Sequence, residues 1–271
     1  MLPLDPDAAS PWTLEQRAEA AARAGWKAIG FQHADLKRAM DRIGFAGVRS
    51  ILDRNGLALE LEALFDWFAD GERRRSSDAW RDFLLRAAGE LGALHIKACG
   101  DLGGGYWPRE RLIEEFGALT DAAIAQGTRI GLELVAESGI ADMPTALAIV
   151  ESVGSKAGGL VLDSWQLARC GIPMREIDTI PPEFVFHVEL ADAAAEQIAT
   201  AIEDTVHRRR LPGAGDIDLD GFVRHVRAGG YTGFWGVEII SDEQRKLTLQ
   251  DAVERPLAAA KDSMTRAFPP P

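Results

Sequence analysis

Four short segments in the second half of the chain decide the fold. They are GLELV at 131–135, GLVLD at 159–163, FVFHVEL at 184–190 and GFWGVEII at 233–240. Each is an apolar or β-branched run of strand length, and longer amphipathic stretches separate one from the next. Strands that alternate with helices in this way pair in parallel, with the helices outside the sheet.

The same alternation extends back to the start of the chain. We predict strands at 27–31, 57–63, 94–99, 129–135, 159–163, 184–190 and 233–240. We predict helices at 13–24, 34–55, 76–92, 108–126, 144–153, 218–228 and 243–265. Pro108 and Gly127 mark the start and the stop of one of these helices, as proline and glycine commonly do.

For 271 residues without a break in composition, the leading solution is an α/β protein with one domain over 1–271, a (β/α)₈ TIM barrel. Its first strand must be short or truncated, because only residues 1–4 are available before the first amphipathic helix. A doubly wound open sheet is the rival architecture. We find no G-x-G-x-x-G turn between a strand and a helix, and the barrel is therefore preferred.

Composition excludes several classes of protein. Hydrophobic residues make up 46% of the chain and charged residues 27%, which is a globular balance with no membrane-spanning run. A net charge of −12 argues against nucleic acid as a partner. Cys99 and Cys170 form no disulfide framework, and the N-terminus lacks the features of a secretory signal. We expect a cytoplasmic protein.

Four successive strands carry a titratable side chain within an apolar run: Glu133, Asp163, His187 and Glu238. Burying such groups is expensive without a partner, and a shared divalent cation is the simplest one. Three carboxylates and one imidazole suit Mn²⁺ best, with Mg²⁺, Co²⁺ or Zn²⁺ as other choices. No cysteine belongs to the set, which argues against a structural zinc site.

The series GLELV, LDSWQ, FHVELAD, RRLPGAGDIDL and GYTGFWGVEI resembles the xylose-isomerase-like superfamily of sugar phosphate isomerases and epimerases. The similar branch includes ketose 3-epimerases, inosose isomerase and dehydratase, and 3-dehydroshikimate dehydratase. The resemblance implies a TIM barrel with one divalent metal ion, held here by Glu133, Asp163, His187 and Glu238. It also implies a small sugar or polyol substrate and a homo-oligomer.

Glu133 and Glu238 are the predicted catalytic pair, acting as base and acid on a carbon next to a metal-polarised carbonyl. Return of the proton gives an epimer or an aldose–ketose isomer, which is the main prediction. Loss of a leaving group gives the alternative, a lyase of the dehydratase or C-glycoside-cleaving type. An endonuclease-like hydrolase on the same barrel and a non-catalytic sugar-binding or scaffold barrel are less favoured readings.

Five further residues are predicted to bind substrate: Arg210, Gln166, Glu189, His33 and Trp107. Arg210 lies in the loop before Pro212, with Arg209 beside it. Gln166 stands where many relatives have histidine, and an amide cannot serve as a base. Glu60 alternates with leucines in its strand, and we expect it to face inward.

Overall fold

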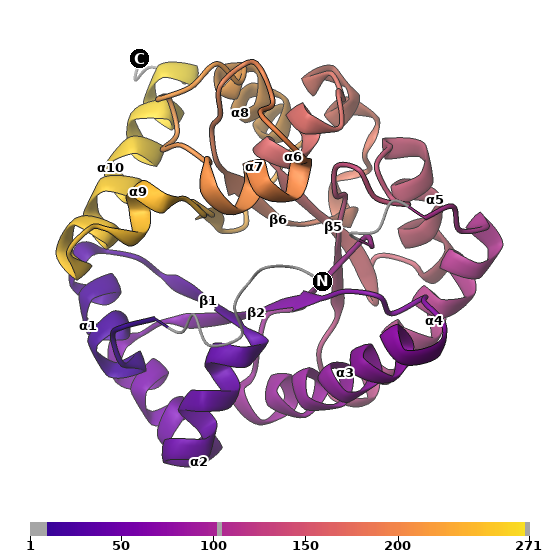
Figure 1. Ribbon diagram of the computed structural model, residues 1–271, viewed down its shortest axis with the longest axis horizontal. Helices are drawn as coiled ribbons and strands as arrows, with labels where there is room; N and C mark the ends of the chain where they lie inside the picture. The colour runs from indigo at the N-terminus through magenta and orange to yellow at the C-terminus, as the bar shows by residue number, and fades with distance from the viewer. Residues whose placement is uncertain (1–9, 102–104, 269–271) are drawn as a thin grey trace.

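The computed structural model describes residues 10–101 and 105–268, and its strands form one parallel sheet. The strands are β1 (Ala28–Gln32), β2 (Ala58–Leu64), β3 (Ile96–Cys99), β4 (Ile130–Glu133), β5 (Gly158–Asp163), β6 (Val185–Leu190) and β7 (Trp235–Val237). They are hydrogen-bonded in sequence order from β1 to β7. The curved sheet occupies the centre of the molecule, and the helices surround it (Figure 1). This arrangement is the predicted TIM barrel architecture.

Most of the surrounding helices fall close to the predicted ranges, whereas the helix at 201–207 was not predicted. The helices are α1 (Leu14–Ala24), α2 (His33–Asn55), α3 (Gly71–Leu91), α4 (Arg109–Ala125), α5 (Met143–Val153), α6 (Ser164–Arg169), α7 (Ala201–His207), α8 (Leu219–Ala228), α9 (Asp242–Arg245) and α10 (Leu249–Ala267). Two 3₁₀ turns, η1 (Met174–Thr179) and η2 (Pro182–Phe184), precede β6. No helix of the described ranges is long and apolar enough to cross a membrane.

Two helix boundaries differ from prediction for local reasons. The helix predicted at 243–265 is divided, because the Thr248 side chain accepts a hydrogen bond from the Asp251 N–H and caps a new helix start. α3 begins at Gly71, five residues before the predicted start at 76. The predicted short opening strand at 1–4 lies outside the described residues.

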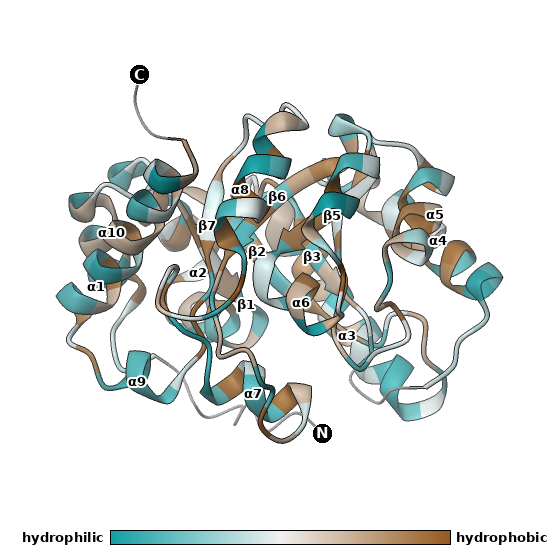
Figure 2. Ribbon diagram, turned by 90° about the horizontal axis from the view of Figure 1, so that it is seen from above, coloured by the Kyte–Doolittle hydropathy of each residue, from teal (hydrophilic) through white to brown (hydrophobic). Residues whose placement is uncertain are grey.

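The core lies between the sheet and the helices. Leu59, Leu61, Ile96, Leu132 and Leu162 are buried in one hydrophobic cluster with apolar faces of the helices. Side chains alternate along a strand, and the residues between these leucines and isoleucines therefore point into the barrel. Figure 2 shows hydrophobic strands at the centre and mixed, partly hydrophilic helices around them.

Candidate active site

Strand register decides which inward side chains meet. Asp163 of β5 is paired with Glu189 of β6, and Glu133 closes β4 beside Cys99 of β3. Glu238 follows β7 directly, and its N–H donates to the Leu190 carbonyl. These carboxylates therefore lie at the carboxyl ends of their strands.

The resulting group contains Glu133, Asp163, Glu189 and Glu238, whose oxygens lie within 4.8 Å of one another. All four donors are oxygens, the donor type that Mg²⁺ and Mn²⁺ prefer. Glu133 Oε1 is buried with no hydrogen-bond partner. An unsatisfied buried oxygen in a carboxylate cluster fits a bound divalent cation. We call this group the four-carboxylate cluster.

The ammonium group of Lys97 lies against this cluster. Lys97 Nζ is 2.8 Å from Glu189 Oε2, 3.6 Å from Glu238 Oε1 and 3.7 Å from Glu133 Oε1. Glu62 of β2 lies 3.5 Å from the same nitrogen. The Lys97 side chain is only 2% exposed, so these carboxylates supply the compensation that water would otherwise give.

Arg209 provides the second buried cation. Its Nη1 donates to Asp163 Oδ2 at 2.6 Å and lies 2.9 Å from Glu238 Oε2. The guanidinium carbon is 4.9 Å from the ring centre of Trp165, a cation–π distance. Arg209 thus links β5 to the end of β7 and fixes two members of the four-carboxylate cluster.

A buried carboxylate shapes the loop that follows Arg209. Asp192 accepts hydrogen bonds from four backbone N–H groups, those of Ala193, Gly213, Gly215 and Ile217. The backbone of Asp192 also pairs with that of Arg210, directly after Arg209. This loop is therefore tied to the end of β6, and the buried guanidinium is held in place.

His187 lies outside the four-carboxylate cluster. It is paired with Val161, two positions before Asp163, and its Nδ1 is 3.0 Å from Glu60 Oε1. Its Nε2 is 3.7 Å from Glu189 Oε1. His187 therefore groups with Glu60 and Glu189, whereas Glu189 is the β6 residue that joins Glu133, Asp163 and Glu238.

Burial and the neighbouring cations shift the pKa values of the carboxyl groups in opposite directions. Burial raises the pKa of Glu133 to about 7 and that of Glu60 to about 7. Burial also opposes ionisation of Glu238, but Lys97 and Arg209 outweigh it and bring the pKa of Glu238 down to about 2. Burial lowers the pKa of His187 to about 3, so this imidazole is neutral. Glu133 and Glu238 thus differ widely in proton affinity.

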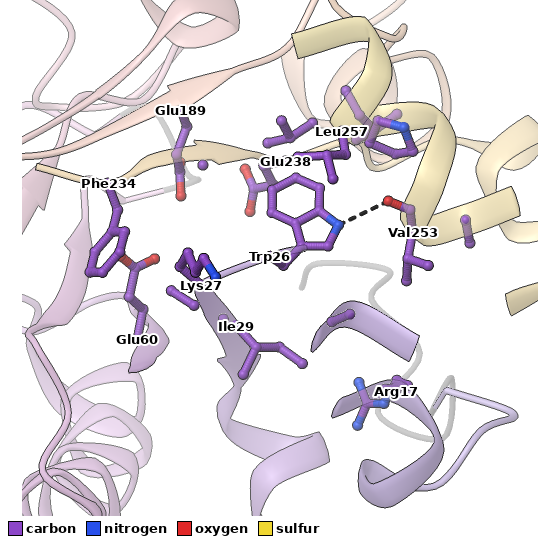
Figure 3. Close-up of a pocket in the computed structure, with 18 of the residues that line it drawn as sticks. Arg17, Trp26, Lys27, Ile29, Glu60, Glu189, Phe234, Glu238, Val253 and Leu257 are labelled. Carbon is purple, nitrogen blue, oxygen red and sulfur yellow. Dashed lines mark hydrogen bonds between the residues drawn. The ribbon is translucent and has the colours of Figure 1, made fainter. Parts of the chain in front are cut away.

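A cavity of about 570 Å³ reaches this site between β1 and β7. Its wall includes Glu60, Glu189 and Glu238 on the polar side and Trp26, Ile29 and Phe234 on the apolar side (Figure 3). β1 and β7 are the edges of the sheet within the described ranges, and the cavity opens between them. Its size suits a small polar molecule.

Of the predicted substrate-binding residues, Glu189 alone belongs to the four-carboxylate cluster. The Gln166 side chain accepts from the Ala136 N–H at 3.0 Å, a structural link. Arg210 is exposed and contacts the Ala214 carbonyl, so the arginine that enters the site is its neighbour Arg209. His33 packs against Trp80 in a tilted arrangement, with ring centres 4.0 Å apart.

Trp107 packs against Phe68 and donates to Asp101, outside the four-carboxylate cluster. Glu60 faces inward as expected, and Glu62 does so too because residues two apart share a strand face. Distance from the strand end is the signal that separates Glu189 from His187. Glu133 and Asp163 end their strands, and Glu189 is one residue from the end of β6, whereas His187 is three residues from it.

Comparisons with family models and with curated proteins agree on one family for this chain. The family model described as "Xylose isomerase-like TIM barrel" matches residues 18–264. A 3-dehydroshikimate dehydratase of Pseudomonas aeruginosa is 29% identical over 85% of this chain and 36% of its own length. An inosose isomerase of Bacillus subtilis is 26% identical over 55% of this chain and 54% of its own length. The chain thus covers about a third of the length of this dehydratase and about half of the length of this isomerase.

Solved structures share the fold at lower identity. The IOLI protein with a binding zinc atom superposes with a TM-score of 0.86 at 20% identity, over 96% of this chain and 95% of its own. D-psicose 3-epimerase from Clostridium cellulolyticum H10 superposes with a TM-score of 0.68 at 16% identity, over 92% of this chain and 93% of its own. These likenesses establish the architecture.

Proposed function

Because the chain belongs to the xylose isomerase-like TIM barrel family, we propose that it is a divalent-metal-dependent isomerase or epimerase of a small sugar or cyclitol. The observation that carries this proposal is the four-carboxylate cluster, one oxygen donor from each of β4, β5 and β6 and one just after β7. The relatives named above are enzymes, and inosose isomerase acts by name on an inosose.

The residues that would hold the ion are Glu133, Asp163, Glu189 and Glu238, with Mn²⁺ as the expected metal and Zn²⁺ as an alternative. When bound, a divalent cation supplies electrophilic polarisation of a carbonyl oxygen and so acidifies the adjacent C–H. Arg209 and Lys97 would stabilise negative charge that develops on the substrate oxygens.

Glu133 and Glu238 reach this site from strands that are not neighbours in the sheet. Their carboxylates would serve as base and acid on the carbon next to the carbonyl, one giving back the proton that the other or the same group has removed. Return of the proton to the opposite face gives an epimer, and return to the neighbouring carbon gives an isomer.

A dehydratase is the second candidate, because the 3-dehydroshikimate dehydratases match 85% and 89% of this chain. The first proton abstraction would be the same. The new C=C bond would then form as the C–O bond of a β-hydroxyl breaks, with the hydroxyl protonated and released as water. The product would be an enone rather than a second sugar.

Two measurements test the proposal. Protein purified without chelator should contain about one divalent ion per chain, and incubation of ketoses and inososes in D₂O should give product with deuterium next to the carbonyl. Glu133→Gln and Glu238→Gln should each lose at least a hundredfold in rate, as expected for general acid–base groups. The exposed Glu110→Gln on α4 is the control. An ultraviolet-absorbing enone without exchange would favour the dehydratase, and metal-free, inactive protein would overturn both functions.

A further inference from the structure

Lys97 lies next to the carboxylates that would bind a metal ion. Its nitrogen is within 3.7 Å of three of the four carboxylates in the four-carboxylate cluster, Glu133, Glu189 and Glu238. The side chain is 98% buried and comes from the middle of β3, so the strand holds it at this place. The four-carboxylate cluster therefore already contains a covalently attached cation.

We propose that Lys97 is a built-in counter-ion that competes with the divalent metal for these carboxylates and so sets the metal affinity of the site. This inference rests on the proposed function, because it concerns the same metal site. Lys97 stabilises the metal-free protein by neutralising carboxylates that would otherwise repel one another. The same positive charge repels an incoming divalent ion and makes metal binding weaker and readily reversible.

The surroundings of Lys97 support an exchange of partners. Glu62 lies 3.5 Å from Lys97 Nζ and is not a member of the four-carboxylate cluster. Lys97 can therefore retain its contact with the Glu62 carboxyl group when the cluster binds metal. Arg209 differs in this respect, because its guanidinium bridges Asp163 and Glu238 and is also held by Trp165 and by Thr205. Lys97 therefore has a carboxyl partner outside the four-carboxylate cluster, whereas both carboxylate partners of Arg209 belong to the cluster.

Lys97→Met, which keeps the length of the side chain and removes the charge, separates this role from a merely structural one. The metal-free variant should melt at a lower temperature than wild type. Its dissociation constant for Mn²⁺, measured by calorimetry, should fall at least tenfold. A simple loss of packing would instead weaken metal binding. Arg169→Met removes another buried ion pair, that with Asp204, and should lower the melting temperature without changing the Mn²⁺ affinity.

A second measurement needs no variant. In ¹⁵N-lysine-labelled wild type, the ammonium signal that exchanges slowly with water belongs to the buried Lys97, and one equivalent of Zn²⁺ should shift it. Unchanged or weaker Mn²⁺ binding by folded Lys97→Met, or a signal that stays in place while Zn²⁺ binds, overturns the inference and leaves the proposed function standing. Wild type that binds neither ion overturns the proposed function itself. A Lys97→Met chain that folds only with metal present supports the inference.

Discussion

The imidazole of His187 fits inside the barrel because residue 236 is glycine. A Cβ atom built on Gly236 would lie 2.6 Å from His187 Nε2 and 3.4 Å from Glu189 Cγ. Gly131 makes room in the same way for His95, at 3.1 Å from its Cδ2. The room for these two imidazoles therefore depends on missing side chains in the neighbouring strands. At the level of single residues, the arrangement of the site therefore depends on these glycines as well as on the charged groups.

Gly236→Ala should therefore destabilise the protein by about 1–3 kcal/mol, because the buried imidazole must move to admit a methyl group. The change should also weaken metal binding through displacement of Glu189. Thermal unfolding and Mn²⁺ titration measure the two effects. Gly117→Ala in α4 is the matched control, since no atom lies within 4 Å of its new methyl group and alanine favours helix. Equal stability of the two variants would contradict the crowding argument.

The sequence pattern predicts three of the four clustered carboxylates, Glu133, Asp163 and Glu238, as metal ligands. It placed His187 with them because an imidazole is a common ligand, whereas the ladder pairs Asp163 with Glu189. Apolar patterns show that a strand exists, but they do not show which residue of one strand lies opposite which of the next. The same limit applies to Arg210, since the sequence does not show which of two adjacent loop arginines turns inward, and Arg209 is the one that contacts Asp163.

At the level of elements, the alternation of apolar runs with amphipathic stretches, together with Pro and Gly signals, predicts the strands and most helices. It does not predict the division of the helix at 242–267. Its signal was present as Thr248 three residues before Asp251, but a continuous amphipathic pattern concealed it. The loop from Arg208 to Ile217 has no periodic pattern. Its path depends on hydrogen bonds to one distant carboxylate, Asp192.

Asp192→Asn should test how far that loop depends on the carboxylate. The amide supplies one oxygen and turns an NH₂ group toward N–H donors, so at least one buried contact is lost. We expect a loss of about 1–3 kcal/mol in stability and faster proteolysis within residues 208–217. Asp216→Asn, which alters a single exposed acceptor for the Ala195 N–H, should leave both properties near wild type. A loop as resistant as wild type in Asp192→Asn would show that other contacts define it.

For the whole molecule, the concentration of buried carboxyls makes stability depend on pH. The pKa of Glu60 rises from 4.5 to about 7 through burial, so the folded chain binds a proton that the unfolded chain releases between these values. This contribution is fully present below pH 4.5 and is lost as the pH rises through 7. Glu62, with a pKa raised to about 8 by burial, acts in the same direction.

Chelator-treated protein should therefore lose unfolding free energy between pH 5 and pH 8, with up to about 3 kcal/mol from Glu60. Urea unfolding at several pH values measures this slope. Glu60→Gln, which is neutral throughout, should flatten it, and the exposed Glu243→Gln should not. An identical pH slope in wild type and Glu60→Gln would refute the assignment of a buried, protonated carboxyl group to Glu60.

The members of the four-carboxylate cluster come from four places along the chain, from β4 to just beyond β7. Each contributes one group, and none of these segments holds two. A synthetic peptide copied from any one of these segments would consequently carry only one of the four oxygen donors. Cation binding arises only after strands distant in the chain have come into register, and it thus reports on completed folding of the second half of the barrel.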